Sequence, residues 1–206
     1  MKKMQAGGFA LSVLLPLAVH AGGLEVGILG DKQVGKAQAL AAATSTNPNP
    51  GSYDAVSPTG YGFRVAYTFL DLKVAGLGAA VTYHPKAEGN LELAGSNLGK
   101  FGDEYTSVGL QADWKFLVNI HAGVDYRSEK LTSSPVPGMS GSTTLTRPWA
   151  KVGLGFSAPM PVVSPFIRLE VAAPLSTPAS KGDNDEDFRK AMAPSLQVAL
   201  YGGIRF

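Results

Sequence analysis

The chain has 206 residues, a formal net charge of +2 and no cysteine, and 45% of its residues are hydrophobic. The lack of cysteine excludes disulfide bonds and thiolate metal sites, and the small net charge argues against a nucleic-acid partner. No run of about 18 apolar residues follows the N-terminal segment, which excludes a helical membrane span. If the protein crosses a membrane, it must do so as a closed β-barrel.

Residues 1–21 have the pattern of a secretory signal peptide. Two lysines follow Met1, an apolar run extends from Phe9 to Val19, and small residues stand three and one positions before the end of the segment. Cleavage after Ala21 leaves residues 22–206 as one domain. It also lowers the number of basic residues from 18 to 16, which equals the number of acidic residues. The mature protein is therefore expected to be close to neutral.

From Leu24 onward, eight segments alternate apolar and polar residues, which predicts β-strands. They are 24–30, 60–69, 72–83, 105–116, 118–128, 145–157, 163–173 and 194–206. The connections between them alternate between long and short, and the long ones are 31–59, 84–104, 129–144 and 174–193. Long loops at one rim and tight turns at the other are typical of transmembrane barrels. The sequence therefore predicts an all-β fold, an eight-stranded antiparallel up-and-down transmembrane β-barrel.

One face of each predicted strand is apolar, and the other carries small and charged residues. Arg or Lys facing lipid at mid-depth would cost about 2 to 4 kcal/mol each, so the charged face is expected inside. An eight-stranded barrel is about wide enough for its own side chains, which predicts a salt-bridged plug. The predicted interior polar network consists of Glu25, Arg64, Lys73, Asp113, Lys115, His121, Asp125, Arg127, Lys151, Arg168, Glu170 and Arg205.

Aromatic residues are expected in two girdles, one at each rim. Alternating strand directions place Phe69, Trp114, Phe116, Phe156 and Phe206 near the rim with short turns, and Tyr61, Tyr83, Tyr105 and Tyr126 near the rim with long loops. Two details are less regular. The third segment requires a bulge near Ala75 and Gly76, and Trp149 stands at a polar-face position whose direction the sequence does not decide.

The last segment alternates strictly up to Phe206. Ile204 and the terminal aromatic Phe206 resemble the assembly signal of bacterial outer-membrane barrels. Together with the loop pattern, this chain resembles the small eight-stranded barrels related to the OmpA transmembrane domain, OmpX, OmpW and the opacity proteins. The resemblance implies a monomer in the outer membrane of a Gram-negative bacterium, in contact with membrane lipid and lipopolysaccharide. It also implies that the barrel-assembly machinery recognises the C-terminal strand.

Two motifs, one glycine-rich and one acidic, have some features of ligand sites. Gly30 to Ala37 nearly spells a phosphate-binding loop, but Ala37 stands where a hydroxyl should meet Mg²⁺ and no parallel βαβ pattern follows, so a surface loop is expected. Asp183 to Asp187 offers hard oxygen ligands without the glycine turn and distant glutamate of a calcium loop, so a solvated acidic loop is expected. The sequence predicts no cofactor and no metal site.

No catalytic residues are predicted, and the protein is not expected to be an enzyme. His84 and His121 remain after signal cleavage, and neither stands in a local motif with a serine and a carboxylate. The long loops, notably 44–58 and 133–146, are rich in polar residues, proline and glycine, which predicts mobility. Because loops on a rigid scaffold often carry recognition, we expect an envelope or surface-interaction role with a surface ligand at the loops. The alternatives are a narrow channel for small or hydrophobic solutes, and a lipid-modifying enzyme.

Overall fold

A computed structural model describes most of the chain after the first 22 residues. The described residues are 23–35, 38–39, 52–55, 58–72, 74–93, 96–134, 141–158, 160, 162–177, 189–190 and 192–206. The predicted signal peptide and the acidic segment Asp183 to Asp187 lie outside these residues, as does most of the predicted loop 44–58. No helix in the described part of the chain has the length and apolar character needed to cross a membrane.

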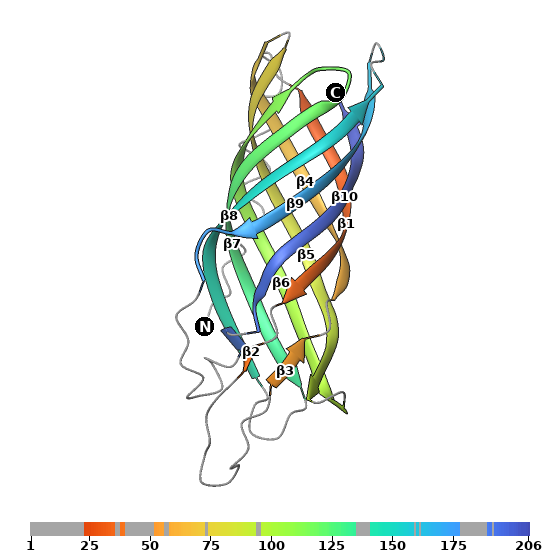
Figure 1. The fold of residues 1–206 in the computed structure, drawn as a ribbon. Coiled ribbons are helices and arrows are strands. Elements are labelled where there is room, and N and C mark those ends of the chain that lie inside the picture. Colours follow the sequence, from red (N-terminus) through yellow and green to blue (C-terminus); the bar gives the residue numbers. More distant parts are fainter. Residues whose placement is uncertain are drawn as a thin grey trace, which may run out of the picture.

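The described residues form ten antiparallel strands, and all of these except β2 and β3 close into one eight-stranded barrel (Figure 1). The strands are β1 Leu24–Gly35, β2 Gln38–Ala39, β3 Ser52–Ala55, β4 Thr59–Asp71, β5 Ala75–Leu93, β6 Ser96–Trp114, β7 Asn119–Ser134, β8 Gly141–Ser157, β9 Ser164–Pro174 and β10 Pro194–Arg205. β1 pairs with both β4 and β10, which closes the barrel. The short pair β2–β3 extends the sheet beside the outer part of β5.

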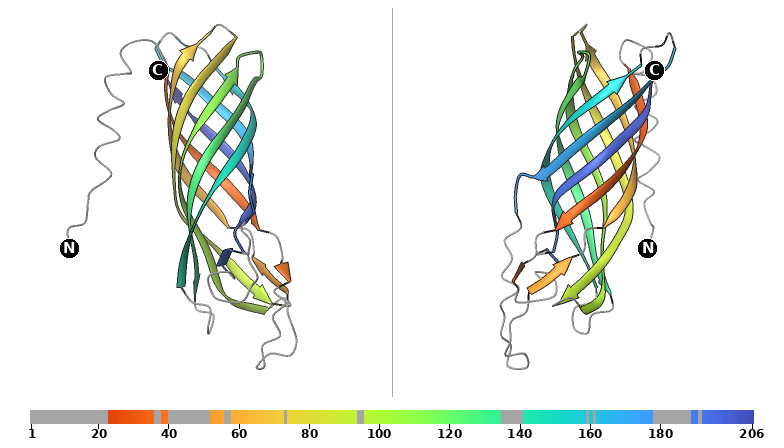
Figure 2. Two further views of the ribbon diagram at one scale, coloured as in Figure 1. Left: turned by 90° about the vertical axis from the view of Figure 1, so that its left-hand side faces the viewer. Right: turned by 45° about the vertical axis from the view of Figure 1, so that its right-hand side comes forward.

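The first and last barrel strands are paired up to the end of the chain. Glu25 lies opposite Arg205, and the Phe206 N–H donates to the Leu24 carbonyl over 2.9 Å. The C-terminus lies at the rim with the short turns, whereas β5, β6, β7 and β8 extend furthest at the opposite end (Figure 2). The closed eight-stranded antiparallel barrel confirms the predicted fold class.

The barrel is apolar outside and polar inside over the central part of its length. Outward side chains such as Ile28, Val108, Leu110, Val152 and Leu169 are more than half exposed to the surroundings. The side chains between them are buried, and many of them are charged. A soluble barrel would place these faces the other way round, because water favours charge outside and excludes apolar surface. This outward apolar band is the lipid-facing belt of a transmembrane barrel.

The strands are longer than the alternation of apolar residues predicts. The predicted loop 84–104 is wrong for most of its length, because β5 continues to Leu93 and pairs with β6 from Ser96. The predicted loop 129–144 is likewise shortened by β7 and β8, and residues 31–35 continue β1 instead of forming a surface loop. Beyond the lipid-facing belt, the outward residues are polar, as at Lys86 and Glu88. The apolar signal therefore stops although the backbone ladder continues.

The irregularity near the first tight turn lies on β4, not on the following strand. The pairing of β4 with β5 shifts between Thr68 and Leu70, so Phe69 is the additional residue. β5 begins at Ala75, and the Leu72 N–H donates to the Ala75 carbonyl over 2.7 Å to close the turn. The predicted bulge at Ala75 and Gly76 is therefore wrong in position.

Candidate functional site: the filled interior and the outer mouth

Glu170 is the centre of the charge network in the half of the barrel near the short turns. The Arg64 guanidinium donates from Nη1 to both carboxylate oxygens of Glu170, over 2.7 and 2.8 Å. Arg168 donates to the same carboxylate over 3.3 Å, and His121 Nε2 lies 3.8 Å from it. These residues come from β4, β7 and β9, so the network ties opposite walls of the barrel together.

Further ion pairs complete this half of the interior. Arg168 also donates to Asp113 over 3.0 Å, and the Asp113 carboxylate lies 3.0 Å from His121 Nδ1. Lys151 donates to both oxygens of Asp125, over 2.9 and 3.1 Å. The Arg205 guanidinium donates to Glu25 over 2.6 Å. Buried charges are retained only where they are paired and hydrogen-bonded. Among the described residues, four carboxylates here face four cationic side chains, which makes this layer neutral when His121 is neutral.

Aromatic rings fill the next level of the interior. The Arg127 guanidinium carbon lies 4.0 Å from the centre of the Tyr105 ring and 3.9 Å from that of Trp149, so this cation is in close contact with two rings. Trp149 therefore points inward, which settles the direction that the sequence left open. Tyr105 is also buried, so its predicted place in the outer girdle is wrong. Tyr105 has the same parity on β6 as the inward Ser107 and Gln111, so the alternation of residues in the sequence indicates that it faces inward.

Towards the long-loop end, a second polar layer follows that the sequence prediction missed. His84 Nε2 lies 2.8 Å from Asp31, and the His84 ring stacks on Tyr105 with 4.8 Å between ring centres. Gln197 donates to Asp31 and to the Tyr105 hydroxyl, and Arg127 donates to Gln197 over 2.9 Å. A separate ion pair joins Arg147 to Glu129 over 2.6 Å. Several of these residues lie in segments predicted as loops, because the outward face beside them is not apolar.

An apolar layer closes the interior at the outer mouth. Met192 is fully buried among Leu91, Phe101 and Leu131, which come from three different strands. The segment that carries Met192 is held on both sides. The Arg189 Nε donates to the Thr143 hydroxyl over 2.8 Å, and Arg147 donates to the Pro194 carbonyl over 2.6 Å. The outer mouth is thus filled by side chains from the strands and from the chain just before β10.

The structure places the predicted interior residues as follows. Lys115 and Arg205 are partly exposed at the short-turn rim, where Lys115 pairs with Asp71, and Lys73 lies outside the described residues. The lipid-facing side chains of Ile204 and Phe206 are exposed. The remaining predicted residues are buried inside the barrel: Glu25, Arg64, Asp113, His121, Asp125, Arg127, Lys151, Arg168 and Glu170.

Neither histidine forms a hydrolytic arrangement with the described residues. His84 is fully buried beside a carboxylate, and none of its hydrogen bonds within the described ranges goes to a serine hydroxyl. A lipid could not reach this ring without displacing the side chains around it. No group of three or more histidine, cysteine or acidic residues in the described part of the chain is arranged to hold a metal ion.

Asp103 is the one buried carboxylate of the outer layer that accepts no hydrogen bond from the described residues. It lies on β6 beyond the level of Tyr83, outside the membrane-spanning part, and is fully buried. Burial raises the pKa of the Asp103 carboxyl well above its usual range, and the charge of Glu129 adds to this shift. Between pH about 3.9, the pKa of an aspartate in the unfolded chain, and the raised pKa of Asp103, the folded protein therefore keeps a proton that the unfolded chain has released.

From this shift we expect wild-type stability to fall as the pH rises from about 4 through the raised pKa of Asp103. Asp103→Asn keeps the shape and removes the titrating group, so its stability should depend less on pH over the same range. The measurement is the temperature at which the folded band disappears on gels, taken at about pH 5 and about pH 9. Asp71→Asn, at an exposed rim position, is the control. Equal pH dependence in wild type and Asp103→Asn would show that Asp103 does not titrate as expected.

The fold matches solved structures of known barrels. The chain is similar to Ail, the attachment invasion locus protein of Yersinia pestis, solved in complex with the heparin analogue sucrose octasulfate. The identity is 18%, the TM-score is 0.51, and the match covers 90% of this chain and 99% of that chain. It is also similar to a major outer membrane protein from Thermus thermophilus, with 14% identity, a TM-score of 0.53 and coverage of 91% and 99%.

No protein-family model and no curated protein matches the sequence. The comparison with known proteins therefore concerns the fold alone. The structure shares with these barrels the closed eight-stranded antiparallel sheet, and it has the lipid-facing belt and filled interior that this architecture requires in a bilayer. The chain has the fold of the small eight-stranded outer-membrane β-barrels, and its outward apolar band is the lipid-facing belt of a transmembrane barrel.

Proposed function

We propose that this protein is a non-conducting barrel that presents its extended outer sheet and loops to molecules outside the cell. The observation that carries the proposal is the contrast between the two parts of the barrel. The interior is filled by ion pairs, stacked aromatic rings and an apolar layer. The strands β5 to β8 continue beyond the lipid-facing belt as a polar sheet. A filled lumen gives solutes no path, so recognition outside the membrane remains as the role.

The outer sheet offers charges of both signs. Lys86 and Lys100 flank Glu88 at 2.5 and 3.5 Å, and Lys130 is exposed on β7. Ail has been solved with a sulfated sugar analogue, but the mixed charges of this outer sheet do not by themselves select an anionic saccharide. Lys32 is exposed on the outward face of β1 near the outer rim, where phosphate groups of lipopolysaccharide would meet it. We therefore infer contact with lipopolysaccharide at this rim. We also propose that the barrel is a monomer, as its resemblance to the small eight-stranded outer-membrane barrels implies.

Ion conductance of the refolded protein in planar bilayers tests this proposal. Formation of the barrel is first established by the difference in gel mobility between heated and unheated samples. We expect a folded barrel without discrete current steps, because paired side chains occupy the lumen. Steady unitary steps from a folded sample would contradict the proposal and make a narrow channel the leading function.

The C-terminal residue is expected to matter for assembly more than for the folded sheet. Phe206→Ala keeps the backbone hydrogen bond to Leu24 and removes the exposed aromatic ring that resembles the assembly signal. We expect less folded protein in the outer membrane of expressing cells, measured as the heat-modifiable band in the membrane fraction. Leu200→Ala removes another exposed apolar side chain from β10 and is the matched control. An equal loss in both variants would point to general strand stability instead of recognition by the assembly machinery.

A further inference from the structure

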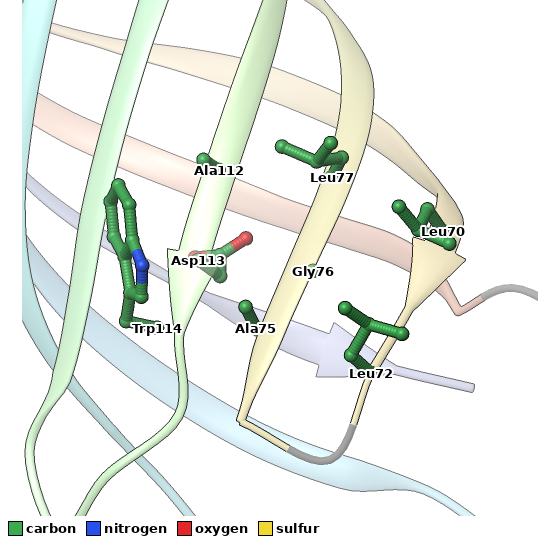
Figure 3. Close-up of a pocket in the computed structure, with 8 residues that line it drawn as sticks. All are labelled: Leu70, Leu72, Ala75, Gly76, Leu77, Ala112, Asp113 and Trp114. Carbon is green, nitrogen blue, oxygen red and sulfur yellow. The ribbon is translucent and has the colours of Figure 1, made fainter.

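A groove lies on the outer wall of the barrel beside the first tight turn. Its volume is about 190 Å³, and Leu70, Leu72 and Trp114 form its sides. Figure 3 shows Trp114 on one side and the two leucines on the other, with Ala75 and Ala112 between them. The groove thus lies across β4, β5 and β6 near the short-turn rim.

The hollow has a local cause in the sequence. Ala75 and Ala112 point outward at positions where neighbouring outward residues of the same strands are larger, such as Leu77 and Leu110. β4 carries the additional residue Phe69 beside the groove, and a tight turn closed by the Leu72 N–H follows. Both features make the sheet irregular at this point. Two small side chains next to this irregularity leave a depression between large ones.

The position of the groove determines what can fill it. Leu72 is 54% exposed and Trp114 is 41% exposed, and both belong to the apolar outer surface at the short-turn rim. This surface is continuous with the lipid-facing belt. Tryptophan at such a rim combines an apolar ring with one N–H donor, which suits the boundary between acyl chains and headgroups.

We propose that this groove is a binding site for a glycerophospholipid of the periplasmic leaflet, with one acyl chain lying between Leu72 and Trp114. The indole N–H of Trp114 then donates to an ester or phosphate oxygen of the same lipid. The proposal rests on the placement of the barrel in the outer membrane.

Two other occupants fit the geometry less well. A second copy of the chain would need about 800 Å² of contact per partner for a stable interface, far more than one groove of this size supplies. An extended peptide would need free backbone groups at a strand edge. β5, which forms the floor of the groove, is paired with β4 on one side and with β6 on the other, so it offers no free backbone groups at this level. An acyl chain needs neither a large interface nor backbone hydrogen bonds.

The test uses the full mature chain refolded with phosphatidylethanolamine and analysed by native mass spectrometry for retained lipid. Ala112→Leu fills the groove, whereas Ala150→Leu adds the same side chain at a partly exposed position on the outward face of β8. We expect Ala112→Leu to bind the retained lipid about tenfold more weakly than wild type, equivalent to about 1.4 kcal/mol, and Ala150→Leu to match wild type. Trp114→Phe keeps a ring and loses the N–H, so its retention should lie between these two.

Several results would overturn the proposal. Equal retention in Ala112→Leu and Ala150→Leu would show that lipid contacts the whole belt without preference. A dimer in the wild type that disappears in Ala112→Leu would assign the groove to a second copy. If Ala112→Leu gives no heat-modifiable band, Ala75→Leu provides the same filling from the neighbouring strand. Because the gel shift reports barrel formation separately, failure of the lipid site is distinguishable from failure of the membrane-barrel proposal.

Discussion

Replacing Glu170 with alanine is expected to destabilise the folded barrel by about 3 to 5 kcal/mol. The change leaves the guanidinium of Arg64 buried without its two hydrogen bonds to a carboxylate, and it removes a partner of Arg168. Removing one partner of a buried pair costs more than removing both, because an uncompensated charge remains in a water-poor interior. The measurement is urea unfolding of the refolded protein in lipid vesicles, followed by gel mobility.

A second variant and a surface pair sharpen this prediction. Arg64→Leu combined with Glu170→Leu removes both charges, so the double variant should be more stable than Glu170→Ala. Asp71→Ala breaks the pair with Lys115 at the short-turn rim, where both side chains are partly exposed. That loss should stay within about 1 kcal/mol, because water screens exposed pairs. If Glu170→Ala and Asp71→Ala cost the same, the interior network does not stabilise the barrel as argued.

Met192→Ala is expected to open the outer mouth and to cost about 2 to 5 kcal/mol of stability. Its side chain is fully buried against Leu91, Phe101 and Leu131, so the truncation leaves a cavity in the apolar layer. The segment before β10 should then be held less tightly, because the contacts of its fully buried methionine side chain with this apolar layer are lost. Hydrogen exchange of the backbone amides around Phe101 and Leu131 measures this opening, together with urea unfolding.

Two further methionine variants serve as controls. Met192→Leu keeps the apolar volume and should cost less than about 1.5 kcal/mol. Met160 is 55% exposed in the turn between β8 and β9, so Met160→Ala should stay within about 0.5 kcal/mol of wild type. Comparable exchange rates for Met192→Ala and Met160→Ala would show that Met192 does not hold the mouth closed.

The alternation of residues determined the lipid-facing part of the barrel from the sequence alone. On β6, for example, Val108 and Leu110 face outward while Ser107 and Gln111 face inward. A strand has a side-chain period of two, and only one solvent, the hydrocarbon of the membrane, lies on its outer face. The polarity of each residue then indicates which face of the strand it occupies. Eight such segments with alternating connections predict a closed barrel.

Above the membrane the same rule reverses, and the sequence pattern becomes ambiguous. There water surrounds the outer face, so Lys86 and Glu88 point outward while Leu91, Phe101 and Leu131 fill the interior. On β6 the large apolar residues change parity between Val108 and Phe101. A search for one continuous apolar face predicts that the strand ends at this change of parity. For this reason the sequence predicts loops where the outer extensions of the strands lie.

The partners of the buried charges were decided only by the tertiary structure. Residue types and parity indicate that Arg64 and Glu170 face inward, but 106 positions separate them in the chain. Which carboxylate meets which guanidinium depends on strand stagger and barrel curvature, and these are properties of the closed sheet. The same holds for Arg127 between Tyr105 and Trp149, and for the insertion of Met192 into the outer mouth. Local alternation thus determined the faces of the strands, whereas closure of the sheet determined the contacts that fill the lumen.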